Sequence, residues 1–573
     1  MIESEQGGVF SMKVVIIGGV AGGATAAARL RRLDESAEIV VLERSGYVSY
    51  ANCGLPYYVG GVITRRGALT LQTPESFRSR FNVDVRVKNE AVEILRGEKC
   101  VRVKRLADGS EYLEPYDKLI LSPGAKALVP DVSGADSGKV FTLRTVEDTF
   151  ALDDFINSAN PARAIVVGGG FIGLETAENL MHRGISVTLV EWGRQVLPQI
   201  DYDMACILHA HLREKGLDLR LNCKVQGFSE KGGLCVGTDK GDLFADFAVM
   251  AVGVTPDTRL AKEAGLSLGI KGAILTDAHM RTSDPDIYAV GDAVQVKNSA
   301  GADALVSLAG PANKQGRIAA DNIAGIASEY KGAAGSSVLK VFDMTAAFTG
   351  LSERGAEAVG LNFDRVVLFS PNHATYYPGA KNMTLKVLFS PESGKLLGAQ
   401  AVGYEGSEKR IDVLAAAMRA GMTAADLQDL DLCYAPPYSS AKDPVNMAGY
   451  VAENVRQGVK QFHWKDLPKV YGEKDAFLLD VRTPQEFAAG HFPGAVNIPV
   501  DELRFRIGEL DRNKRIYVNC QSGLRSYIAC RMLMGHGFDC LNFSGGYRFY
   551  AIVAGEARAE GRACHPCGIP AED

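Results

Sequence analysis

The chain has 573 residues, of which 46% are hydrophobic and 23% charged, and its formal net charge is −5. This length exceeds what one hydrophobic core fills, so we expect roughly three or four domains of an ordinary soluble α/β protein. No strongly basic or acidic stretch occurs, which argues against a nucleic-acid partner and against an acidic scaffold. The sequence contains no run of 18 apolar residues, so we expect no membrane span.

The eleven cysteines are scattered and do not follow the spacing of a small disulfide framework. This distribution favours a reducing compartment, and we expect a cytoplasmic protein. The apolar residues 14–17 are too few for a signal peptide and run directly into a glycine turn. Residues 1–11 read as an extension, so we expect the fold to begin at Met12.

The first dinucleotide motif begins with a strand over 13–17 and the turn Gly18-Gly19-Val20-Ala21-Gly22-Gly23. A helix is expected over 24–33 and a second strand over 38–42, which ends in Glu43. Such a turn lets the backbone approach a pyrophosphate at a helix N-terminus. Gly18, Gly22 and Gly23 are its phosphate-turn glycines, although Val20 replaces the second glycine of G-x-G-x-x-G. Glu43 lies about where a ribose 2′-hydroxyl needs an acceptor.

The pattern returns near residue 162. A strand over 164–167 leads into Gly168-Gly169-Gly170-Phe171-Ile172-Gly173, a helix over 174–181 and a strand over 187–190. Gly168, Gly170 and Gly173 match the motif fully, and Glu191 follows the second strand. An acid at this position accepts from a free 2′-hydroxyl and repels a 2′-phosphate, which predicts NADH. Arg194 keeps NADPH open as an alternative.

A third element points to the flavin. Strands are expected over 246–251 and 287–290, and the second ends in Gly291-Asp292. After two dinucleotide motifs, we expect Asp292 to accept a hydrogen bond from the ribityl chain of FAD. Cys53 lies in Ser49-Tyr50-Ala51-Asn52-Cys53-Gly54-Leu55-Pro56, soon after the first motif, where a flavin should lie.

The C-terminal module is built around Cys520. A strand over 515–519 precedes it and a helix begins near Arg525. Backbone N–H groups, the helix dipole and the charge of Arg525 would together favour a thiolate. Tyrosine phosphatases use Cys-x5-Arg, whereas this loop is Cys-x4-Arg, too tight for a phosphate and suited to one sulfur atom. Cys530 and Cys540 are expected to be packed side chains.

The polar stretches predict linkers over 331–337 and 455–465 and a loose tail beyond Gly555. Cys564-His565-Pro566-Cys567 in that tail has the spacing of a redox pair or of half a metal site. We predict no essential role and no metal site for it. The expected domains are an FAD-binding domain over 12–124 and 251–332, an NAD(P)H-binding domain over 125–250, an α+β domain over 337–455 and an α/β domain over 466–555.

Residues 12 to about 455 resemble the flavin-dependent pyridine nucleotide–disulfide oxidoreductases, in the single-cysteine branch with coenzyme A-disulfide reductase, NADH oxidase and NADH peroxidase. Two-cysteine members carry Cys-x4-Cys, but here Tyr58 stands five positions after Cys53. Cys53 must therefore cycle as a mixed disulfide, a persulfide or a sulfenic acid. The peroxidase and oxidase members need an early histidine, and the first one here is His182.

The stretch 49–56, Tyr376-Tyr377-Pro378-Gly379 and the run from Tyr434 to Lys442 are similar to coenzyme A-disulfide reductases. The resemblance implies a homodimer in which Tyr376 and Tyr434 reach across the interface to the reactive cysteine. Asn313 stands where a relative has a histidine that contacts coenzyme A. The residues implied to contact coenzyme A are Thr25, Arg29, Arg32, Ser49, Asn52, Asn313 and Lys442.

Residues 466–555 resemble rhodanese sulfurtransferase domains, through Leu479-Asp480-Val481-Arg482, the segment 490–495, the Cys520 loop and Gly545-Gly546-Tyr547. The expected fold class is α/β: two Rossmann-like dinucleotide-binding domains, an α+β dimerisation domain and a rhodanese α/β domain. The whole chain resembles coenzyme A-disulfide reductase–rhodanese fusions, including NADH-dependent persulfide reductases.

The resemblance implies that NADH reduces FAD, which reduces a Cys53 persulfide or mixed disulfide, while Cys520 collects sulfane sulfur from a polysulfide or persulfide. Arg525 would assist Cys520, and coenzyme A would carry sulfur to Cys53.

Three alternatives stay open. The first is a coenzyme A-disulfide reductase with a loosely coupled sulfurtransferase, and the second is an NADH oxidase. In the third, the rhodanese module only docks or senses a partner.

Overall fold

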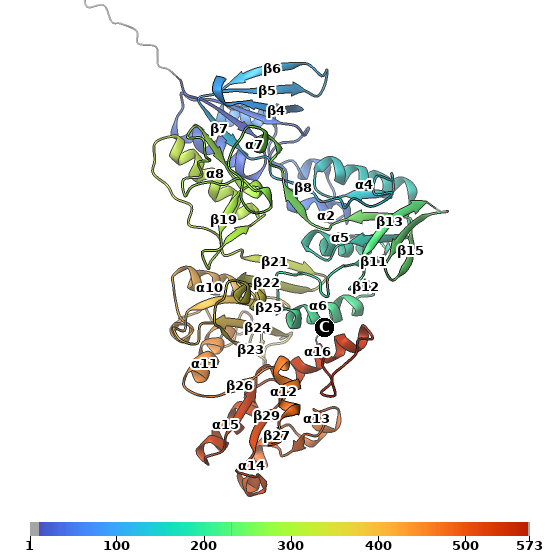
Figure 1. The fold of residues 1–573 in the computed structure, drawn as a ribbon, viewed down its shortest axis with the longest axis vertical. Helices are drawn as coiled ribbons and strands as arrows, with labels where there is room; N and C mark the ends of the chain where they lie inside the picture. The colour runs from blue at the N-terminus through green and yellow to red at the C-terminus, as the bar shows by residue number, and fades with distance from the viewer. Residues whose placement is uncertain (1–10, 231, 571–573) are drawn as a thin grey trace, which may run out of the picture. The chain divides into compact units, whose positions relative to one another are not determined.

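The computed structural model describes residues 11–230 and 232–570 (Figure 1). Its internal contacts divide the chain into two compact units. The first holds the residues up to Val190 together with Lys224–Gly335, and the second holds Glu191–Cys223 and the chain from Ser336 onward. Among the helices of the described residues, none has the length and apolar character that a membrane crossing requires.

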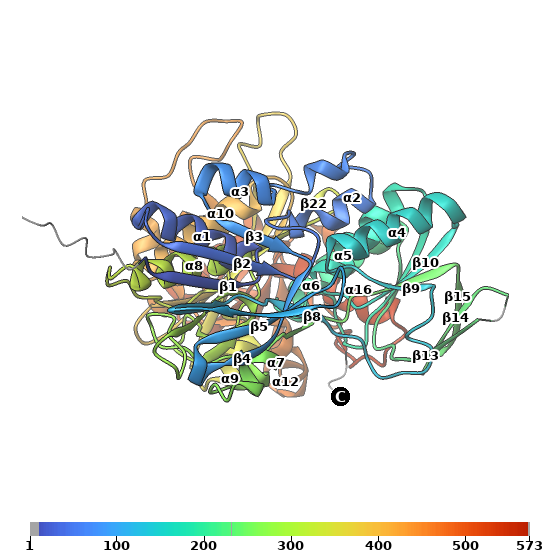
Figure 2. The same ribbon diagram turned by 90° about the horizontal axis from the view of Figure 1, so that it is seen from above.

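The first unit contains a parallel sheet in the order β18-β7-β1-β2-β3. Val15 of β1 pairs with Val40 of β2 and with Leu119 of β7. These strands are buried on both faces, which explains their unbroken apolar sequences. Helix α1 lies beside β1 and β2 (Figure 2) and packs against α8. The elements are β1 Lys13–Ile17, α1 Ala21–Leu33, β2 Glu38–Glu43, α3 Pro74–Phe81, β3 Asp84–Val87, β7 Lys118–Leu121, α7 Arg259–Glu263, β18 Ile287–Ala289 and α8 Ala309–Ile323.

A second parallel sheet of the same unit runs in the order β11-β10-β16-β9. Helix α5 packs on β10 and β11, and two antiparallel three-stranded sheets, β4-β5-β6 and β13-β14-β15, accompany the two parallel sheets. The elements are β4 Asn89–Leu95, β5 Cys100–Arg105, β6 Glu111–Pro115, β8 Ala125–Ala127, β9 Val140–Thr142, α4 Val146–Ala159, β10 Arg163–Val167, α5 Phe171–His182, β11 Ser186–Val190, β13 Val225–Glu230, β14 Leu234–Thr238, β15 Gly241–Ala245, β16 Phe247–Met250, β17 Val254–Pro256, β19 Gln295–Lys297 and β20 Asp303–Leu305.

The second unit contains an antiparallel sheet in the order β21-β22-β25-β24-β23. Helices α10 and α11 cover it, and the shared core holds Leu385, Ile411 and Val445. Helix α6, which comes from the segment 191–223, also packs on β25. The elements are α6 Tyr202–Glu214, β12 Asp218–Arg220, β21 Ser337–Val341, β22 Met344–Gly350, α9 Glu353–Ala358, β23 Asp364–Pro371, β24 Asn382–Phe389, β25 Leu396–Gly403, α10 Ser407–Arg419 and α11 Pro444–Arg456.

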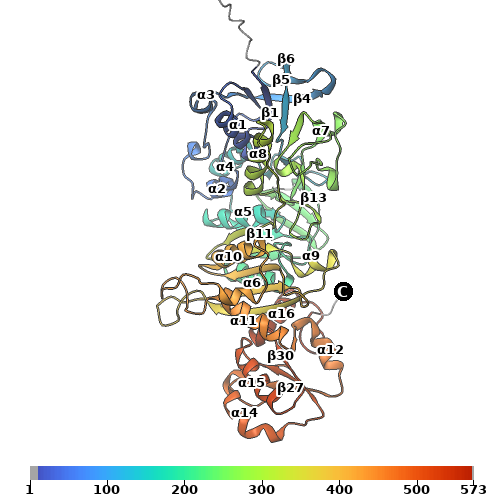
Figure 3. The ribbon, with the colours of Figure 1, turned by 90° about the vertical axis from the view of Figure 1, so that its left-hand side faces the viewer.

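The C-terminal module is a parallel sheet in the order β26-β30-β29-β27-β28 with helices on both faces. Helices α14 and α15 cover one face, and α12 and α16 cover the other (Figure 3). The elements are β26 Gln461–Phe462, α12 Leu467–Gly472, β27 Ala476–Asp480, α13 Pro484–Ala488, β28 Val496–Asn497, α14 Val500–Arg506, β29 Arg515–Asn519, α15 Leu524–Gly535, β30 Cys540–Phe543 and α16 Gly546–Ala559.

The expected α/β fold class is confirmed, and the strands at 13–17 and 515–519 have the predicted bounds. The helix expected over 24–33 begins three residues earlier, at Ala21, because the glycine turn itself contributes its first helical turn. The domain boundaries proposed from the sequence stay predictions.

Two expectations about polar stretches are wrong. The segment 455–465 is no free linker, because it carries β26, which pairs with β30, and Trp464, whose indole N–H donates to Asp203 at 2.9 Å. The tail beyond Gly555 is packed as well: α16 runs to Ala559, and the Tyr550 hydroxyl donates to the Cys567 carbonyl at 2.7 Å. In both stretches a few apolar or paired side chains anchor a segment whose average composition is polar.

Candidate active site

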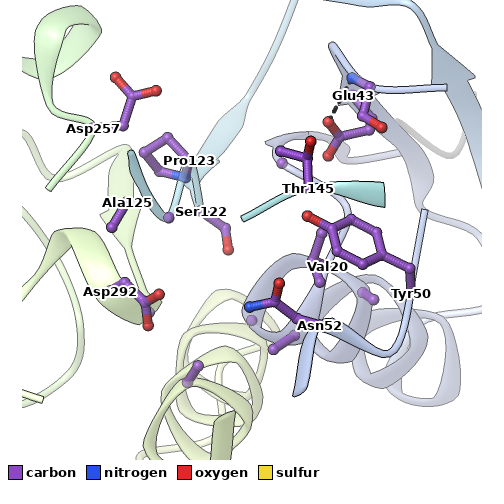
Figure 4. A pocket seen from close by; sticks show the side chains of 18 of the residues that line it. Val20, Glu43, Tyr50, Asn52, Ser122, Pro123, Ala125, Thr145, Asp257 and Asp292 are labelled. Atoms are coloured by element: carbon purple, nitrogen blue, oxygen red, sulfur yellow. Dashed lines mark hydrogen bonds between the residues drawn. The ribbon is translucent and has the colours of Figure 1, made fainter. Parts of the chain in front are cut away.

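A cavity of about 550 Å³ lies in the first unit between the Gly18 turn, the turn that carries Cys53 and the loop after β18. Glu43 and Asp292 approach it from different sides, with Ser122 and Asn52 between them (Figure 4). Residues from four segments that are far apart in the sequence thus line this cavity. A volume of this size holds a small-molecule cofactor.

The glycine turn brings backbone to the edge of this cavity. Gly18 has φ +97°, a conformation that favours glycine, and a Cβ there would clash with the Ser122 carbonyl. A Cβ on Gly23 would clash with the Gly18 carbonyl, so helix α1 can start this close to β1 only with glycine. Gly22 lines the cavity at the first turn of that helix. The arrangement is the one a pyrophosphate needs.

Glu43 is buried at the end of β2, on the side of the same turn. Its carboxylate accepts hydrogen bonds from the Gly19 N–H at 2.8 Å and the Ser45 N–H at 2.9 Å. Burial raises its pKa, while these two donors oppose the rise. Each carboxylate oxygen has a further lone pair, so Glu43 can still accept from a ribose hydroxyl.

Asp292 lines the cavity in the turn that follows β18. The Arg144 guanidinium lies 3.4 Å from its carboxylate. Burial raises the pKa of Asp292, and the charge of Arg144 acts against that rise. The sequence analysis did not find Arg144, which also lines the cavity and lies 148 positions away along the chain.

Cys53 lies in the short helical turn Asn52–Gly54, which precedes helix α2 (Leu55–Val59), and its side chain faces the cavity. No described cysteine forms a disulfide. The pKa of the Cys53 thiol is raised, first by desolvation and then by the carboxylate of Glu175, with Arg144 acting in the opposite direction. The protein surroundings of Cys53 therefore favour the thiol.

Glu175 on α5 is a second residue that the sequence analysis missed. It accepts a hydrogen bond from the Tyr57 hydroxyl at 3.2 Å. Burial and the charge of Glu178 raise the pKa of Glu175, and the Tyr57 hydrogen bond lowers it; together they bring it to about 7. A carboxyl that titrates near neutral pH thus acts electrostatically on Cys53.

Four of the residues implied to contact coenzyme A line the cavity together with Cys53: Thr25, Ser49, Asn52 and Asn313. The Thr25 hydroxyl donates to the Asn313 side-chain oxygen at 2.8 Å. Arg29 and Arg32 do not line the cavity. Arg29 pairs with Asp321 at 2.7 Å, and Arg32 is exposed on α1. The roles of all these residues toward coenzyme A stay predictions.

Tyr376 and Tyr434 are brought together in the second unit, where their hydroxyl oxygens lie 2.6 Å apart. Both side chains are exposed, at 74% and 48% of their surface. The hydrogen bond to Tyr434 raises the pKa of Tyr376. Arg410 holds the loop behind them through Asp443 at 2.9 Å, and Lys442 is exposed in that loop.

The second glycine turn repeats the geometry of the first. Gly168 has φ +109°, Gly170 caps helix α5 and faces open space, and Gly173 packs directly on the Gly168 carbonyl. Glu191 follows β11 in the chain, and its carboxylate accepts from the Gly193 N–H at 2.6 Å. The turn provides backbone N–H groups for a second pyrophosphate.

Cys520 is buried at the end of β29. The Gly523 N–H lies 3.1 Å from its sulfur, and the Ser526 hydroxyl donates to the sulfur at 3.2 Å. Gly523 has φ +101° and starts α15, and the Tyr547 N–H donates to the Cys520 carbonyl at 2.7 Å. The loop is therefore closed around one sulfur atom. Ser526, one position after Arg525, is a contact that the sequence analysis missed.

Arg525 makes two contacts of 2.7 Å with the carboxylate of Glu486, which lowers the pKa of Glu486 to about 2. The charge of Arg525 thus acts on the carboxylate of Glu486 and also on Cys520. A second arginine, Arg482, is buried, pairs with Asp480 at 2.7 Å and lies over the ring of Tyr547. Arg482 also donates to the side-chain oxygen of Gln521 at 3.3 Å, which ties it to the Cys520 loop.

Residues 12–316 match the family described as pyridine nucleotide-disulphide oxidoreductase, and residues 336–444 match the dimerisation domain of that family. The chain belongs to this family. Residues 464–551 match the rhodanese-like domain. The resemblances predicted from the sequence are confirmed.

Named relatives and solved structures agree with this family. A coenzyme A disulfide reductase of Staphylococcus haemolyticus (strain JCSC1435) is 36% identical over 447 residues, 77% of this chain and all of that protein. The structure of reduced Bacillus anthracis CoADR-RHD is 47% identical, covers 95% of this chain and 99% of its own, and has a TM-score of 0.94. A NAD-dependent persulfide reductase from A. fulgidus is 38% identical, covers 94% and 100%, and has a TM-score of 0.87.

Proposed function

We propose that this enzyme uses NAD(P)H and FAD to reduce the sulfur of coenzyme A persulfide or coenzyme A disulfide, and that its rhodanese module supplies sulfane sulfur. The observation that carries the proposal is the presence of two differently built cysteine sites in one chain. Cys53 faces a dinucleotide-sized cavity, and Cys520 lies in a loop closed around a single sulfur atom. The relatives named coenzyme A disulfide reductase and persulfide reductase support the substrate class.

The cavity of the first unit fits FAD. Its glycine turn leaves room that a Cβ would fill, and Glu43 and Asp292 line the cavity. Glu43 would accept a hydrogen bond from the ribose of FAD, and Asp292 would accept one from the ribityl chain. Bound FAD supplies two-electron redox chemistry beside Cys53. NADH would bind at the Gly168 turn, with Glu191 favouring it over NADPH.

The chemistry at Cys53 follows from a single thiol. Its sulfur attacks the outer sulfur of coenzyme A persulfide, the S–S bond breaks, coenzyme A leaves as a thiol after gaining a proton, and Cys53 becomes a persulfide. Two electrons and one proton then return Cys53 to the thiol and release hydrosulfide. With coenzyme A disulfide, the same attack gives a mixed disulfide, and two electrons and two protons release the second coenzyme A.

The exposed phenol pair Tyr376 and Tyr434 supplies the proton for a departing thiolate in this proposal. We place these residues in the active site of the partner subunit of a homodimer, in line with the match to the dimerisation domain. Lys442, exposed in the same loop, and Arg29 and Arg32 of α1 would contact coenzyme A phosphates. A cytoplasmic location is proposed because the reaction consumes NADH and coenzyme A derivatives.

At the other site, the Cys520 sulfur attacks the outer sulfur of a polysulfide or low-molecular-weight persulfide, the donor's S–S bond breaks and Cys520 becomes a persulfide. After gaining a proton, the persulfide donor leaves as a thiol and the polysulfide donor leaves one sulfur atom shorter. The Gly523 N–H and the Ser526 hydroxyl contact Sγ of Cys520, the atom that would carry the transferred sulfur.

The test is to measure sulfide release and NADH oxidation together, with coenzyme A persulfide, with coenzyme A disulfide and with oxygen alone. The proposal expects one sulfide for each NADH with the persulfide and negligible oxygen uptake. NADH oxidation that proceeds at full rate with oxygen and without a sulfur substrate would favour an oxidase. Such an activity is named for a Lactobacillus brevis structure that is 28% identical, covers 78% of this chain and 99% of its own, and has a TM-score of 0.75.

A further inference from the structure

The loop after Glu191 is held by a buried histidine of helix α6. The Val196 N–H lies 3.1 Å from His209 Nε2, and His209 is 0% exposed. Because Nε2 accepts this hydrogen bond, the proton of the neutral ring is on Nδ1. Burial lowers the pKa of His209, so the ring is neutral at neutral pH. A neutral imidazole thus fixes the backbone five residues after Glu191.

The other side of the same ring faces the rhodanese module. Nδ1 lies 3.1 Å from a carboxylate oxygen of Glu556 on α16. This contact is not well aligned as a hydrogen bond, and the carboxylate acts on the N–H mainly as a nearby charge. Arg213 binds both oxygens of Glu556, at 2.6 and 3.0 Å. Burial raises the pKa of Glu556, but the paired Arg213 guanidinium and the nearby His209 ring lower it to about 2, so Glu556 is ionised at neutral pH.

A second contact joins the loop to the same region. The Arg194 guanidinium lies 4.8 Å from the ring centre of Tyr202, at the start of α6. Tyr202 in turn packs with Val553 of α16 and with Trp464. Two residues of α6, His209 and Tyr202, therefore contact the loop 191–196. Both of them also contact residues of the rhodanese module.

We infer that the rhodanese module shapes the adenosine-binding part of the NADH site: α16, acting through Glu556 and His209, holds the loop 191–196 so that Glu191 faces the ribose. His209 and Glu556 are positioning residues, since neither touches the nucleotide. The inference rests on the proposed function, in which Glu191 accepts from the 2′-hydroxyl of NADH. It gives the rhodanese module a role in nucleotide binding that is separate from its sulfur chemistry.

The test is the kinetics of NADH oxidation by ferricyanide, an acceptor that needs no sulfur substrate. His209→Asn removes the acceptor of the Val196 N–H, and we expect the KM for NADH to rise about tenfold while kcat stays the same. His209→Gln places an amide oxygen near the former Nε2, so its KM should stay within about twofold of the wild type. Glu556→Gln removes the charge beside Nδ1 and should raise the KM about threefold.

The chain offers a matched control on the same helix. His211 is also buried, but its Nε2 lies 3.1 Å from Asp343 and its contacts do not include the loop. His211→Asn should therefore leave the KM for NADH unchanged. Reduced nicotinamide mononucleotide lacks the adenosine, and its KM should be the same in every variant.

An unchanged KM for NADH in His209→Asn would overturn the inference, and so would an equal rise for the mononucleotide. If His209→Asn does not fold, as judged by the absorbance of bound FAD, the Kd for NADH of Glu556→Gln is measured instead. A raised Kd supports the inference, and an unchanged Kd overturns it. Because ferricyanide bypasses sulfur, a wild-type enzyme that fails to reduce coenzyme A persulfide counts against the proposed function only. An unchanged KM in Glu191→Gln would refute the ribose contact itself.

Discussion

The two cysteines that we propose as reactive have opposite surroundings. Cys53 faces an open cavity, and its thiol pKa is raised by desolvation and by the carboxylate of Glu175. Cys520 is buried, with the Gly523 N–H and the Ser526 hydroxyl already directed at its sulfur. The Cys53 site needs a bound cofactor and substrate to supply its remaining contacts. The sulfur of Cys520 already has its hydrogen-bond donors in the folded chain.

This difference matches the two kinds of chemistry. A sulfur carrier must stabilise a charged persulfide for as long as it waits for an acceptor, so fixed donors are useful throughout the cycle. A redox cysteine must change between reduced and oxidised forms while substrate and cofactor come and go. A site that strongly stabilised either the reduced or the oxidised cysteine would slow its conversion to the other form.

The largest effect should separate the two cysteines. Cys53→Ser removes the one cysteine among the described residues that line the cavity, and we expect NADH-dependent reduction of coenzyme A disulfide and persulfide to fall by at least about 1,000-fold. Cys520→Ser should lose sulfur transfer from a polysulfide donor by a similar factor, while reduction of coenzyme A disulfide continues. The measurement is NADH absorbance with each substrate in turn. Equal loss of both activities in Cys520→Ser would mean that the two sites act as one.

The next effect concerns the fixed donors at Cys520. Ser526→Ala removes the hydroxyl 3.2 Å from the sulfur and leaves the backbone donor of Gly523 in place. We expect sulfur transfer to slow about 10- to 100-fold, which corresponds to the loss of one hydrogen bond to a charged group. Thiosulfate or polysulfide turnover of the full chain measures this rate. Ser526→Thr, which retains a hydroxyl, serves as the control, and a rate for Ser526→Ala equal to the wild type would remove Ser526 from the site.

The features that could be predicted from the sequence each depend on a short run of adjacent residues. Both glycine turns, the strands at 13–17 and 515–519, and both reactive cysteines were found because each signal lies within a few adjacent residues. The family resemblance added the phenol pair Tyr376 and Tyr434, which the structure places 2.6 Å apart. Ser526 was also within reach of local reasoning, since a hydroxyl in the first turn of α15 faces the loop.

What the sequence could not predict comes from distant parts of the chain. Arg144 and Glu175 act on Cys53 although they lie about ninety or more positions away, and neither is part of a motif. Glu556 looked like a solvated residue of a polar tail, yet it pairs with Arg213, 343 positions away. Composition averages over a segment and cannot show which single side chain finds a buried partner in the fold.

The smallest effect tests why Cys53 favours the thiol. Glu175→Gln removes the negative charge that raises the pKa of Cys53, so the thiolate should form at lower pH. We expect alkylation of Cys53 by iodoacetamide at neutral pH to become about threefold faster, in a background without the other exposed cysteines. Because the pKa of Glu175 is raised to about 7, the wild-type repulsion appears as pH rises through that value, which broadens the titration curve. The variant should show a simpler curve shifted toward lower pH. An unchanged titration curve would mean that the charge of Glu175 does not contribute and that desolvation sets the reactivity of Cys53.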